Sequence, residues 1–254
     1  MTPINLKTPE QIAIMKLAGQ KLKSIRLALK DFSQPGVKLS DIESLAQTMI
    51  KQAGGQPSFS MVKGYQWATC INLNEGLVHG VPDDKVIKEG DLVSIDVGIF
   101  YQGFHSDSAV SFIAGKASDH PQKQKLLSIG QLALKNSIKQ AKPGNRIGHI
   151  SSLMQKTIES AGFNVARNLT GHGLGRNLHE SPAVPCFLSG SIDQTPLIEA
   201  GLTIAIEAIY MAGNFDTTTD PQDNWTIITK DRKDAAMFEH SVAVTNSGPV
   251  VLTG

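Results

Sequence analysis

The chain has 254 residues, of which 41% are hydrophobic, and its 24 basic side chains nearly balance 23 acidic ones to give a formal charge of +1. This is an ordinary globular composition, which excludes a disordered, collagen-like or heavily basic protein. A chain of this length can bury a large core without disulfides, and its net charge gives no electrostatic reason to expect a nucleic-acid or membrane-surface partner.

The two cysteines, Cys70 and Cys186, and the N-terminal sequence bear on the cellular compartment. Two thiols without a CxxC pair cannot form a disulfide framework or a cysteine-ligated zinc finger, which fits a reducing environment. The first residues lack the apolar core of a signal peptide, and the longest apolar stretch, 200–213, is too short for a membrane span and contains Glu207. We therefore expect an unprocessed, soluble, cytoplasmic protein.

Two helices are predicted near the N-terminus. The sequence from Thr8 has the pattern of an N-cap, a first-turn proline and a capping-box glutamine, and apolar residues then recur every three or four positions. These signals predict an amphipathic helix over roughly 9–31. Ser40 and Glu43 repeat the capping pattern ahead of a second periodic segment, which Gly54 would end.

The same arrangement returns later in the chain. A helical pattern over about 122–141 precedes a second Pro-Gly turn, and another periodic segment follows it. A shift of 108 positions aligns the two segments with nine identities, which helix periodicity alone does not explain. The identical pairs are Pro35 and Pro143, Gly36 and Gly144, Ile42 and Ile150, Ser44 and Ser152, Leu45 and Leu153, Gln47 and Gln155, Ile50 and Ile158, Ala53 and Ala161, and Gly54 and Gly162. We therefore predict one α+β domain over 1–254 around a central antiparallel sheet. Its helix-helix-strand pseudo-repeats, at about 8–118 and 119–254, would be related by a pseudo-two-fold axis.

The duplication extends into the segments after the helices. An H-x-x-P sequence begins at His79 in the first half and at His179 in the second. Asp96 ends one apolar, β-branched run, and Glu207 ends the corresponding run in the second half. Both runs are typical of strands rather than helices, so each half supplies one histidine and one acid near a strand.

Two strand-like segments, 91–100 and 103–112, are separated by a short turn. If the turn has two residues, Asp107 pairs opposite Gly98, and Asp96 lies two residues further along on the same face. The two carboxylates are then diagonal neighbours. A three-residue loop would instead place the two carboxylates on opposite faces of the hairpin.

Glu207 and Glu239 interrupt other apolar segments. An ionised carboxylate in such surroundings costs several kcal/mol or becomes protonated, so a compensating cation is expected. Together with Asp96 and Asp107, these acids are the usual ligand set for two divalent metals. His172, in a glycine-rich segment, would add an imidazole, and such an oxygen-rich site favours Mn(II), Fe(II) or Co(II) over zinc.

Structural interpretations compete with these assignments. A lone acid in a strand is more often a solvent-facing residue, and Asp96 by itself would be interpreted in that way. Its match with Glu207, together with two further acids, favours a metal site. His79 and His179 could be loop residues, although their matched settings favour catalytic roles. We expect structural positions for the other histidines, His105, His120, His149 and His240.

With these residues assembled, the chain resembles a type I methionine aminopeptidase with the pita-bread fold. The resemblance covers nearly the whole chain, and the ligand types occur in the order and spacing of that family. It rests on Asn74-Glu75, His79-Gly80-Val81-Pro82, Asp96, Phe104-His105-Ser106-Asp107, Gly171-His172-Gly173, His179-Glu180-Ser181-Pro182, Ile206-Glu207 and Phe238-Glu239-His240.

The resemblance implies a reaction and the residues that perform it. It implies removal of the initiator methionine when the second residue is small, by metal-activated water, with two divalent ions (Co, Mn, Fe or Zn). Glu207 would also be the general base, His179 would contact the carbonyl oxygen, and His79 the scissile amide nitrogen. The family's metal ligands fall on Asp96, Asp107, His172, Glu207 and Glu239.

The resemblance also implies a pocket for the methionine side chain. A flexible thioether suits walls of aromatic and sulfur-bearing side chains. The chain departs from the usual family pattern at Asn177-Leu178, where an aromatic residue ordinarily precedes the histidine, and around 59–67. The pocket aromatics could instead be core residues. The implied pocket residues are Phe59, Val62, Tyr65, Cys70, Leu178 and Trp225.

Two alternative functions remain open from the sequence. A proline-directed aminopeptidase or dipeptidase shares the fold, but such relatives usually carry an additional N-terminal domain. A catalytically silent binding protein would typically have lost ligands that are all present here. The expected partner is the N-terminal peptide of nascent proteins, with possible ribosome association, no nucleic-acid or membrane partner, and a monomeric state.

Overall fold

The computed structural model describes residues 3–254, which form a mixed α+β structure. The α-helices are α1 (Pro9–Phe32), α2 (Leu39–Gln52), α3 (Pro121–Ile138) and α4 (Ile147–Glu159). The strands are β1 (Gln56–Pro57), β2 (Thr69–Leu73), β3 (Gly76–Val78), β4 (Leu92–Tyr101), β5 (Phe104–Ile113), β6 (Asn164–Val165), β7 (Thr170–Gly173), β8 (Glu180–Pro185), β9 (Thr203–Met211), β10 (Thr217–Thr219), β11 (Ile227–Thr229), β12 (Ala235–Thr245) and β13 (Gly248–Val251).

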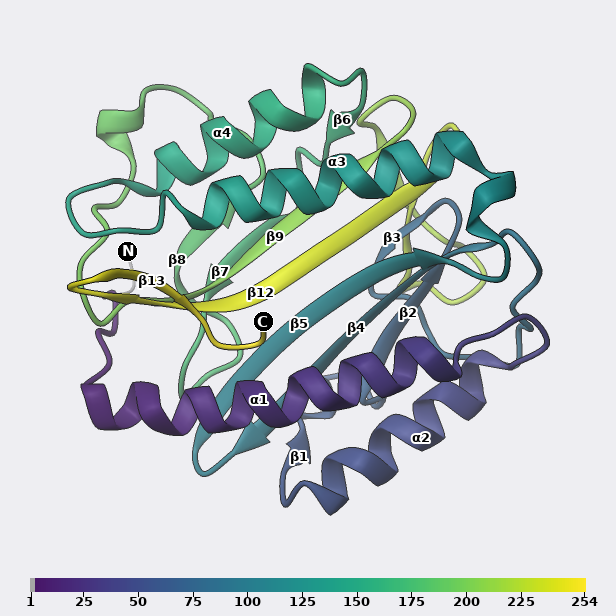
Figure 1. The fold of residues 1–254 in the computed structure, drawn as a ribbon, viewed down its shortest axis with the longest axis horizontal. Helices are drawn as coiled ribbons and strands as arrows, with labels where there is room; N and C mark the ends of the chain where they lie inside the picture. The colour runs from purple at the N-terminus through teal and green to yellow at the C-terminus, as the bar shows by residue number, and fades with distance from the viewer. Residues whose placement is uncertain (1–2) are drawn as a thin grey trace.

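The strands form antiparallel sheets that the helices cover on one face. α1 and α3 lie across the same side of the long central strands, with α2 beside α1 and α4 beside α3 (Figure 1). One sheet contains β1, β4, β2 and β5, and another follows the order β13-β12-β9-β7-β8 with β6 beside β9. A small third sheet has the order β10-β11-β3. The predicted α+β class is confirmed, and the strands at its centre divide into two sheets that meet at β5 and β12.

The turns before α2 and α4 have the same backbone conformation. Gly36 and Gly144 occupy the same left-handed region, with φ of 95° and 88°, and no heavy atom would contact a Cβ at either position. Glycine is therefore required there by the backbone and not by close packing. Each second helix is also preceded by an isolated antiparallel bridge, from Lys38 in one half and from Arg146, 108 positions later, in the other. The turn and the bridge before the second helix are thus alike in both helix pairs, and the duplication of the whole chain stays a prediction.

Serine side chains join the two sheets between β5 and β12. The Ser108 hydroxyl donates to the carbonyl of Glu239 at 2.9 Å. The Ser111 hydroxyl donates to the Met237 carbonyl and accepts from the Met237 amide. Ser241 makes the reciprocal pair of bonds with the backbone of Asp107. This seam satisfies buried backbone groups and holds the two halves in register at the centre of the molecule.

Strand alternation separates the helix-facing side of the sheets from the opposite side. On β4, Val93, Ile95 and Val97 belong to a core cluster shared with α1 and α2. Asp96 has the opposite parity and therefore points away from these helices. On β9, Tyr210 donates a hydrogen bond from its hydroxyl to the Leu126 carbonyl of α3. The acids of the central strands are thus placed on the face that the helices leave uncovered.

The predicted helices are present, but one predicted cap is wrong. Thr8 caps α1 with a complete capping box, as predicted. Ser40 does not cap α2, because the helix begins at Leu39 and places Ser40 within its first turn. Glu43 instead accepts hydrogen bonds from the backbone of Ala68 and Thr69. Within residues 3–254, none of the helices combines the length and apolar character needed to cross a membrane.

Candidate metal centre and substrate pocket

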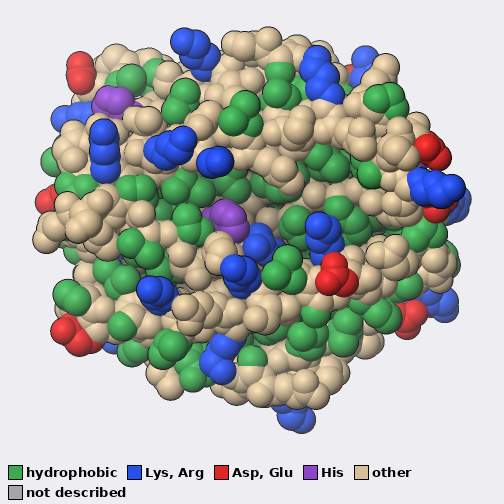
Figure 2. Space-filling model, viewed as in Figure 1, with side chains coloured by type: hydrophobic (Ala, Val, Ile, Leu, Met, Phe, Trp, Pro, Cys, Tyr) green, Lys and Arg blue, Asp and Glu red, His purple; other side chains and the backbone are tan. Residues whose placement is uncertain are grey.

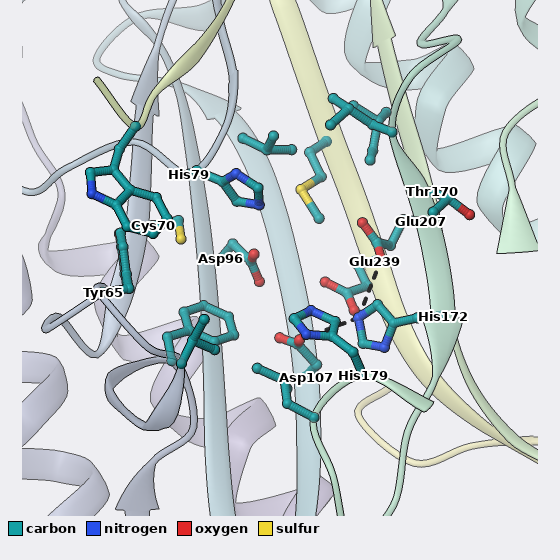
Figure 3. Close-up of a pocket in the computed structure, with 18 of the residues that line it drawn as sticks. Tyr65, Cys70, His79, Asp96, Asp107, Thr170, His172, His179, Glu207 and Glu239 are labelled. Atoms are coloured by element: carbon teal, nitrogen blue, oxygen red, sulfur yellow. Dashed lines mark ion pairs between the residues drawn. The ribbon is translucent and has the colours of Figure 1, made fainter. Parts of the chain in front are cut away.

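A pocket of about 470 Å³ opens on the face of the central strands away from the helices. All of the residues predicted for metal binding, catalysis and substrate recognition line it. Figure 3 shows Tyr65 and Cys70 at one end and Asp96 beside them toward the middle. The other acids and His172 gather at the opposite end. The predicted residues brought together are Phe59, Val62, Tyr65, Cys70, His79, Asp96, Asp107, His172, Leu178, His179, Glu207, Trp225 and Glu239. Their chemical roles remain predictions.

Asp96 and Asp107 come from the hairpin of β4 and β5. The hairpin turn has two residues, Gln102 and Gly103, both with positive φ (48° and 84°), as a twist-compatible two-residue turn requires. This turn places Asp107 opposite Gly98, and Asp96 opposite Ala109 two positions along. The two carboxylates are therefore diagonal neighbours on one face, as the shorter loop predicts.

The second half contributes the other acids and an imidazole. Glu207 on β9 lies directly opposite Glu239 on β12. His172 on β7 approaches both halves, with its Nε2 atom 3.6 Å from Glu207 Oε1 and 4.0 Å from Asp107 Oδ2. Asp107, His172 and Glu239 each offer a ligand atom, and these atoms lie within 4.8 Å of one another. Asp96 and Glu207 line the same pocket beyond this tight group.

The carboxylates are in an environment that disfavours their charge. Burial raises the pKa of Asp96 to about 7 and raises those of Asp107, Glu207 and Glu239 well above their usual values. Neighbouring carboxylates raise the last three further. Among the described residues, Asp96 Oδ1, Asp107 Oδ1 and Glu239 Oε1 are buried without a hydrogen-bond partner. Buried, mutually repelling and unsatisfied oxygens fit divalent cations as their missing partners.

His172 is oriented so that one ring nitrogen stays available. Its Nδ1 atom lies 2.9 Å from the Gly173 carbonyl, to which a protonated Nδ1 donates. That hydrogen bond leaves Nε2 as the lone-pair donor facing the acids. Burial lowers the pKa of His172 to about 4, so the ring is neutral at physiological pH. A neutral imidazole with a fixed tautomer is the form that binds a metal.

His79 and His179 line the same pocket and are both exposed. His79 follows β3 in a left-handed conformation, with φ of 59°, which is uncommon for a residue with a side chain. The His179 ring packs edge-to-face on His172, with ring centroids 4.5 Å apart. Burial lowers the pKa of both His79 and His179, and His179 lowers that of His79 further. Both rings are therefore neutral near pH 7 and can donate or accept a hydrogen bond.

The opposite end of the pocket is apolar. Phe59, Tyr65, Cys70 and Leu178 form one buried cluster, and Val62, Trp67 and Trp225 pack against it. The Tyr65 ring meets the Trp67 and Trp225 rings edge-to-face, and its hydroxyl donates to the Thr69 carbonyl at 2.8 Å. Burial raises the pKa of the Cys70 thiol well above its usual value, and nearby Asp96 adds to this shift. Cys70 is therefore a protonated, apolar part of the wall.

Sequence reasoning missed several residues that line the pocket. They include apolar side chains on β3, β9 and β12 and in the segment before β7, which no sequence signal separates from ordinary core residues. His105 and His240 have structural partners as expected, because their Nδ1 atoms lie 2.9 Å from Ser58 Oγ and Thr253 Oγ1. The missed pocket residues are Val78, Asn168, Leu169, Thr170, Ile209 and Met237.

Comparison with known proteins agrees with this geometry. Residues 13–246 match metallopeptidase family M24. The chain is 38% identical over 247 residues to methionine aminopeptidase 1 of Bacillus subtilis, covering 97% of this chain and 98% of that protein. It is 39% identical over 257 residues to the methionine aminopeptidase of Aquifex aeolicus, covering 98% of each.

Solved structures show the same architecture. The methionine aminopeptidase of Thermotoga maritima superimposes with a TM-score of 0.94 at 39% identity, covering 99% of both chains. The prolidase of Pyrococcus furiosus shares the fold alone, with a TM-score of 0.79 at 24% identity, covering 98% of this chain and 65% of the prolidase. The predicted resemblance and pita-bread fold are confirmed, and the chain belongs to metallopeptidase family M24.

Proposed function

We propose that this metallopeptidase removes the N-terminal methionine from peptides and newly made proteins whose second residue is small. The observation that carries the proposal is the pocket itself, which joins an acidic, metal-binding end to an apolar end with aromatic and sulfur-bearing walls. A substrate with its amine at the acidic end and its first side chain at the apolar end would be cleaved after one residue. The full-length similarity to methionine aminopeptidases supports this assignment.

The acids and His172 would hold two divalent cations, of Co, Mn, Fe or Zn. The unsatisfied oxygens of Asp96, Asp107 and Glu239 and the free Nε2 of His172 supply donors of the right type. Glu207 lies beside His172 and opposite Glu239, which places it within the same donor set. When bound, the ions would supply Lewis-acid activation of water and of the substrate carbonyl.

Three protein groups would act on the reacting atoms. Glu207, at the edge of the metal group, would accept the proton of the attacking water. His179 would donate a hydrogen bond to the carbonyl oxygen as negative charge develops there. His79, across the pocket, would contact the scissile amide nitrogen and assist departure of the amine. Both imidazoles suit these roles because the pocket keeps them neutral.

The apolar cluster would select methionine. An unbranched thioether can fill the irregular space between aromatic rings, and sulfur makes favourable contacts with ring edges. Tyr65, Trp225 and Cys70 provide such walls, and Leu178 closes the pocket beside His179.

A metal-dependent release assay tests the function directly. Metal-free protein reloaded with Mn²⁺ or Co²⁺ should release methionine from Met-Ala-Ser and leave an X-Pro peptide intact. Preferential cleavage of the X-Pro peptide would instead assign a proline-directed enzyme. Release from neither peptide, with metal bound, would assign a silent binding protein.

We further propose that the protein acts as a cytoplasmic monomer on nascent chains in association with the ribosome. The charges that balance over the whole chain are segregated, since 120–158 contains seven basic residues and no acid. Lysines also recur along α1. Figure 2 shows that basic side chains gather over the face that α1 and α3 cover in Figure 1. Such a face suits a polyanionic ribosomal surface. Co-sedimentation with ribosomes that weakens between low and moderate salt, and light scattering, test these two proposals.

A further inference from the structure

Lys7 is a buried cation in the segment that precedes α1. Only 5% of its side chain is exposed, and its ammonium pairs with Glu180, whose side chain is equally buried. The same ammonium donates to the Asn5 carbonyl at 2.9 Å, and the Lys7 amide donates to the Gly201 carbonyl at 2.7 Å. The N-terminal segment is therefore attached to the second half of the molecule through both backbone and side chain.

The ion pair is enclosed by the loop that leads to His179. The second carboxylate oxygen of Glu180 accepts a hydrogen bond from the Asn177 amide at 3.1 Å. A Cβ at Gly175 would lie 2.3 Å from Lys7 Cε and 2.9 Å from Glu180 Oε1, so a side chain there would displace the ion pair. The loop is thus folded around the Lys7 ammonium.

His179 lies between two anchored neighbours. Leu178 is buried in the apolar cluster of the pocket, and Glu180 is held by Lys7. The His179 side chain itself is exposed to the pocket and rests on the His172 ring. A second cavity, of about 340 Å³, is lined by His172 and His179 together with Pro3 and Asn5, so the N-terminal segment also borders the site.

We propose that Lys7 is a positioning residue that acts through Glu180 to hold His179 in its reactive orientation. The inference rests on the proposed role of His179. A buried ion pair is a poor source of net stability, but removal of one partner leaves an uncompensated charge that the surrounding loop must move to solvate. Such movement would displace His179, and a displacement of about 1 Å costs on the order of 100-fold in rate.

A double-mutant cycle tests the coupling. Lys7→Met keeps the length and apolar stem of the side chain and removes its charge. In the otherwise unaltered, metal-loaded enzyme we expect kcat for Met-Ala-Ser to fall about 10- to 100-fold, with little change in KM or bound metal. In the His179→Ala background the same substitution should lower kcat less than about twofold, because the group on which Lys7 acts is already absent.

Matched variants separate positioning from general destabilisation. Lys16→Met removes an exposed lysine of α1 and should leave kcat unchanged. Glu180→Gln keeps the shape of the partner side chain but removes its charge, so it should reproduce the loss of kcat. This variant also provides the test if Lys7→Met does not fold. The two substitutions combined should cost no more than either alone.

Equal losses from Lys7→Met with and without His179, or an unchanged kcat, would overturn the inference and leave the proposed function standing. Full activity of His179→Ala alone would overturn the inference together with the proposed role of His179, because His179 would then have no catalytic role for Lys7 to support. The release of methionine by that variant would still support the proposed function.

Discussion

The acidic end of the pocket and its apolar end are built from neighbouring strands, but they affect the folded state in opposite ways. Cys70 and Asp96 face one another across β2 and β4, and mark the boundary between the two ends. On one side, aromatic and aliphatic groups bury apolar area, which stabilises the fold. On the other, buried acids with raised pKa values and unsatisfied oxygens oppose it.

This difference indicates which part of the site depends on a ligand. The apolar end is complete in the protein alone, because its side chains satisfy one another. The acidic end gains its favourable interactions when cations bind, so metal affinity and stability are coupled there. Substitutions at the two ends should therefore separate cleanly into effects on metal binding and effects on substrate affinity.

The largest effect is expected at the acidic end. Asp107→Ala or Glu239→Ala removes a member of the tight donor group and should abolish measurable turnover. The bound metal, measured by atomic absorption after dialysis, should fall in parallel. Asp91→Ala, at an acid outside the pocket, provides the control. Full activity with unchanged metal content in Asp107→Ala would end the proposal of a metal site at this position.

A smaller effect is expected for the two histidines between the ends. His79→Ala and His179→Ala should keep their metal but lose about 2–4 kcal/mol of transition-state stabilisation, mainly in kcat. Measuring kcat and the bound metal content of the same variant distinguishes a catalytic role from metal ligation. Loss of bound metal from His179→Ala would show that this ring is a ligand and not a hydrogen-bond donor to substrate.

The apolar end should respond in substrate affinity alone. Trp225→Ala should lower kcat/KM for Met-Ala-Ser by about 1–3 kcal/mol through lost contact with the methionine side chain, with metal content unchanged. Trp67 supplies a matched control, because it packs on the same cluster without lining the pocket. If Trp67→Ala and Trp225→Ala reduced kcat/KM equally, the effect would be one of folding and not of recognition.

The smallest effect concerns the pH dependence of stability in the metal-free protein. An unfolded Asp96 loses its proton near its ordinary pKa of 3.8, whereas the folded protein retains it up to about pH 7. The folded state therefore binds more protons in this window, and stability should fall as pH rises through it, by on the order of 5 °C in Tm. Asp96→Asn should flatten this slope in calorimetry. A metal-free protein that becomes more stable from pH 4 to pH 7, with no change in slope on substitution, would contradict the assigned burial.

Local patterns predict the elements and the relative placement of the first two acids. A two-residue turn fixes strand register, so the sequence of the hairpin alone is enough to place Asp96 and Asp107 on one face. The matched Pro-Gly turns of the two helix pairs likewise depend on local backbone conformation. The predicted Ser40 cap is wrong because a Ser-x-x-Glu pattern does not specify where a helix begins, and tertiary contacts with 68–69 decide the role of Glu43.

Long-range contacts could not be predicted from the sequence. The serine seam between β5 and β12 pairs residues more than 100 positions apart, and serine is otherwise common in exposed turns. Lys7 and Glu180 are 173 positions apart, and each alone is indistinguishable from a solvated charge. Apolar pocket residues such as Ile209 and Met237 share the pattern of core residues, so only their position beside the acids identifies them.

The pocket acids and His172 are proposed to form one site for two divalent cations. Isothermal titration of the metal-free protein with Mn²⁺ tests this proposal most directly. We expect two equivalents to bind, with proton release near neutral pH, because acids whose pKa values burial raises must lose their protons to bind metal. In Asp107→Ala, binding at both positions should weaken together. Binding of fewer than two equivalents by the unaltered protein, or undiminished binding of two equivalents by Asp107→Ala, would contradict a shared two-cation site.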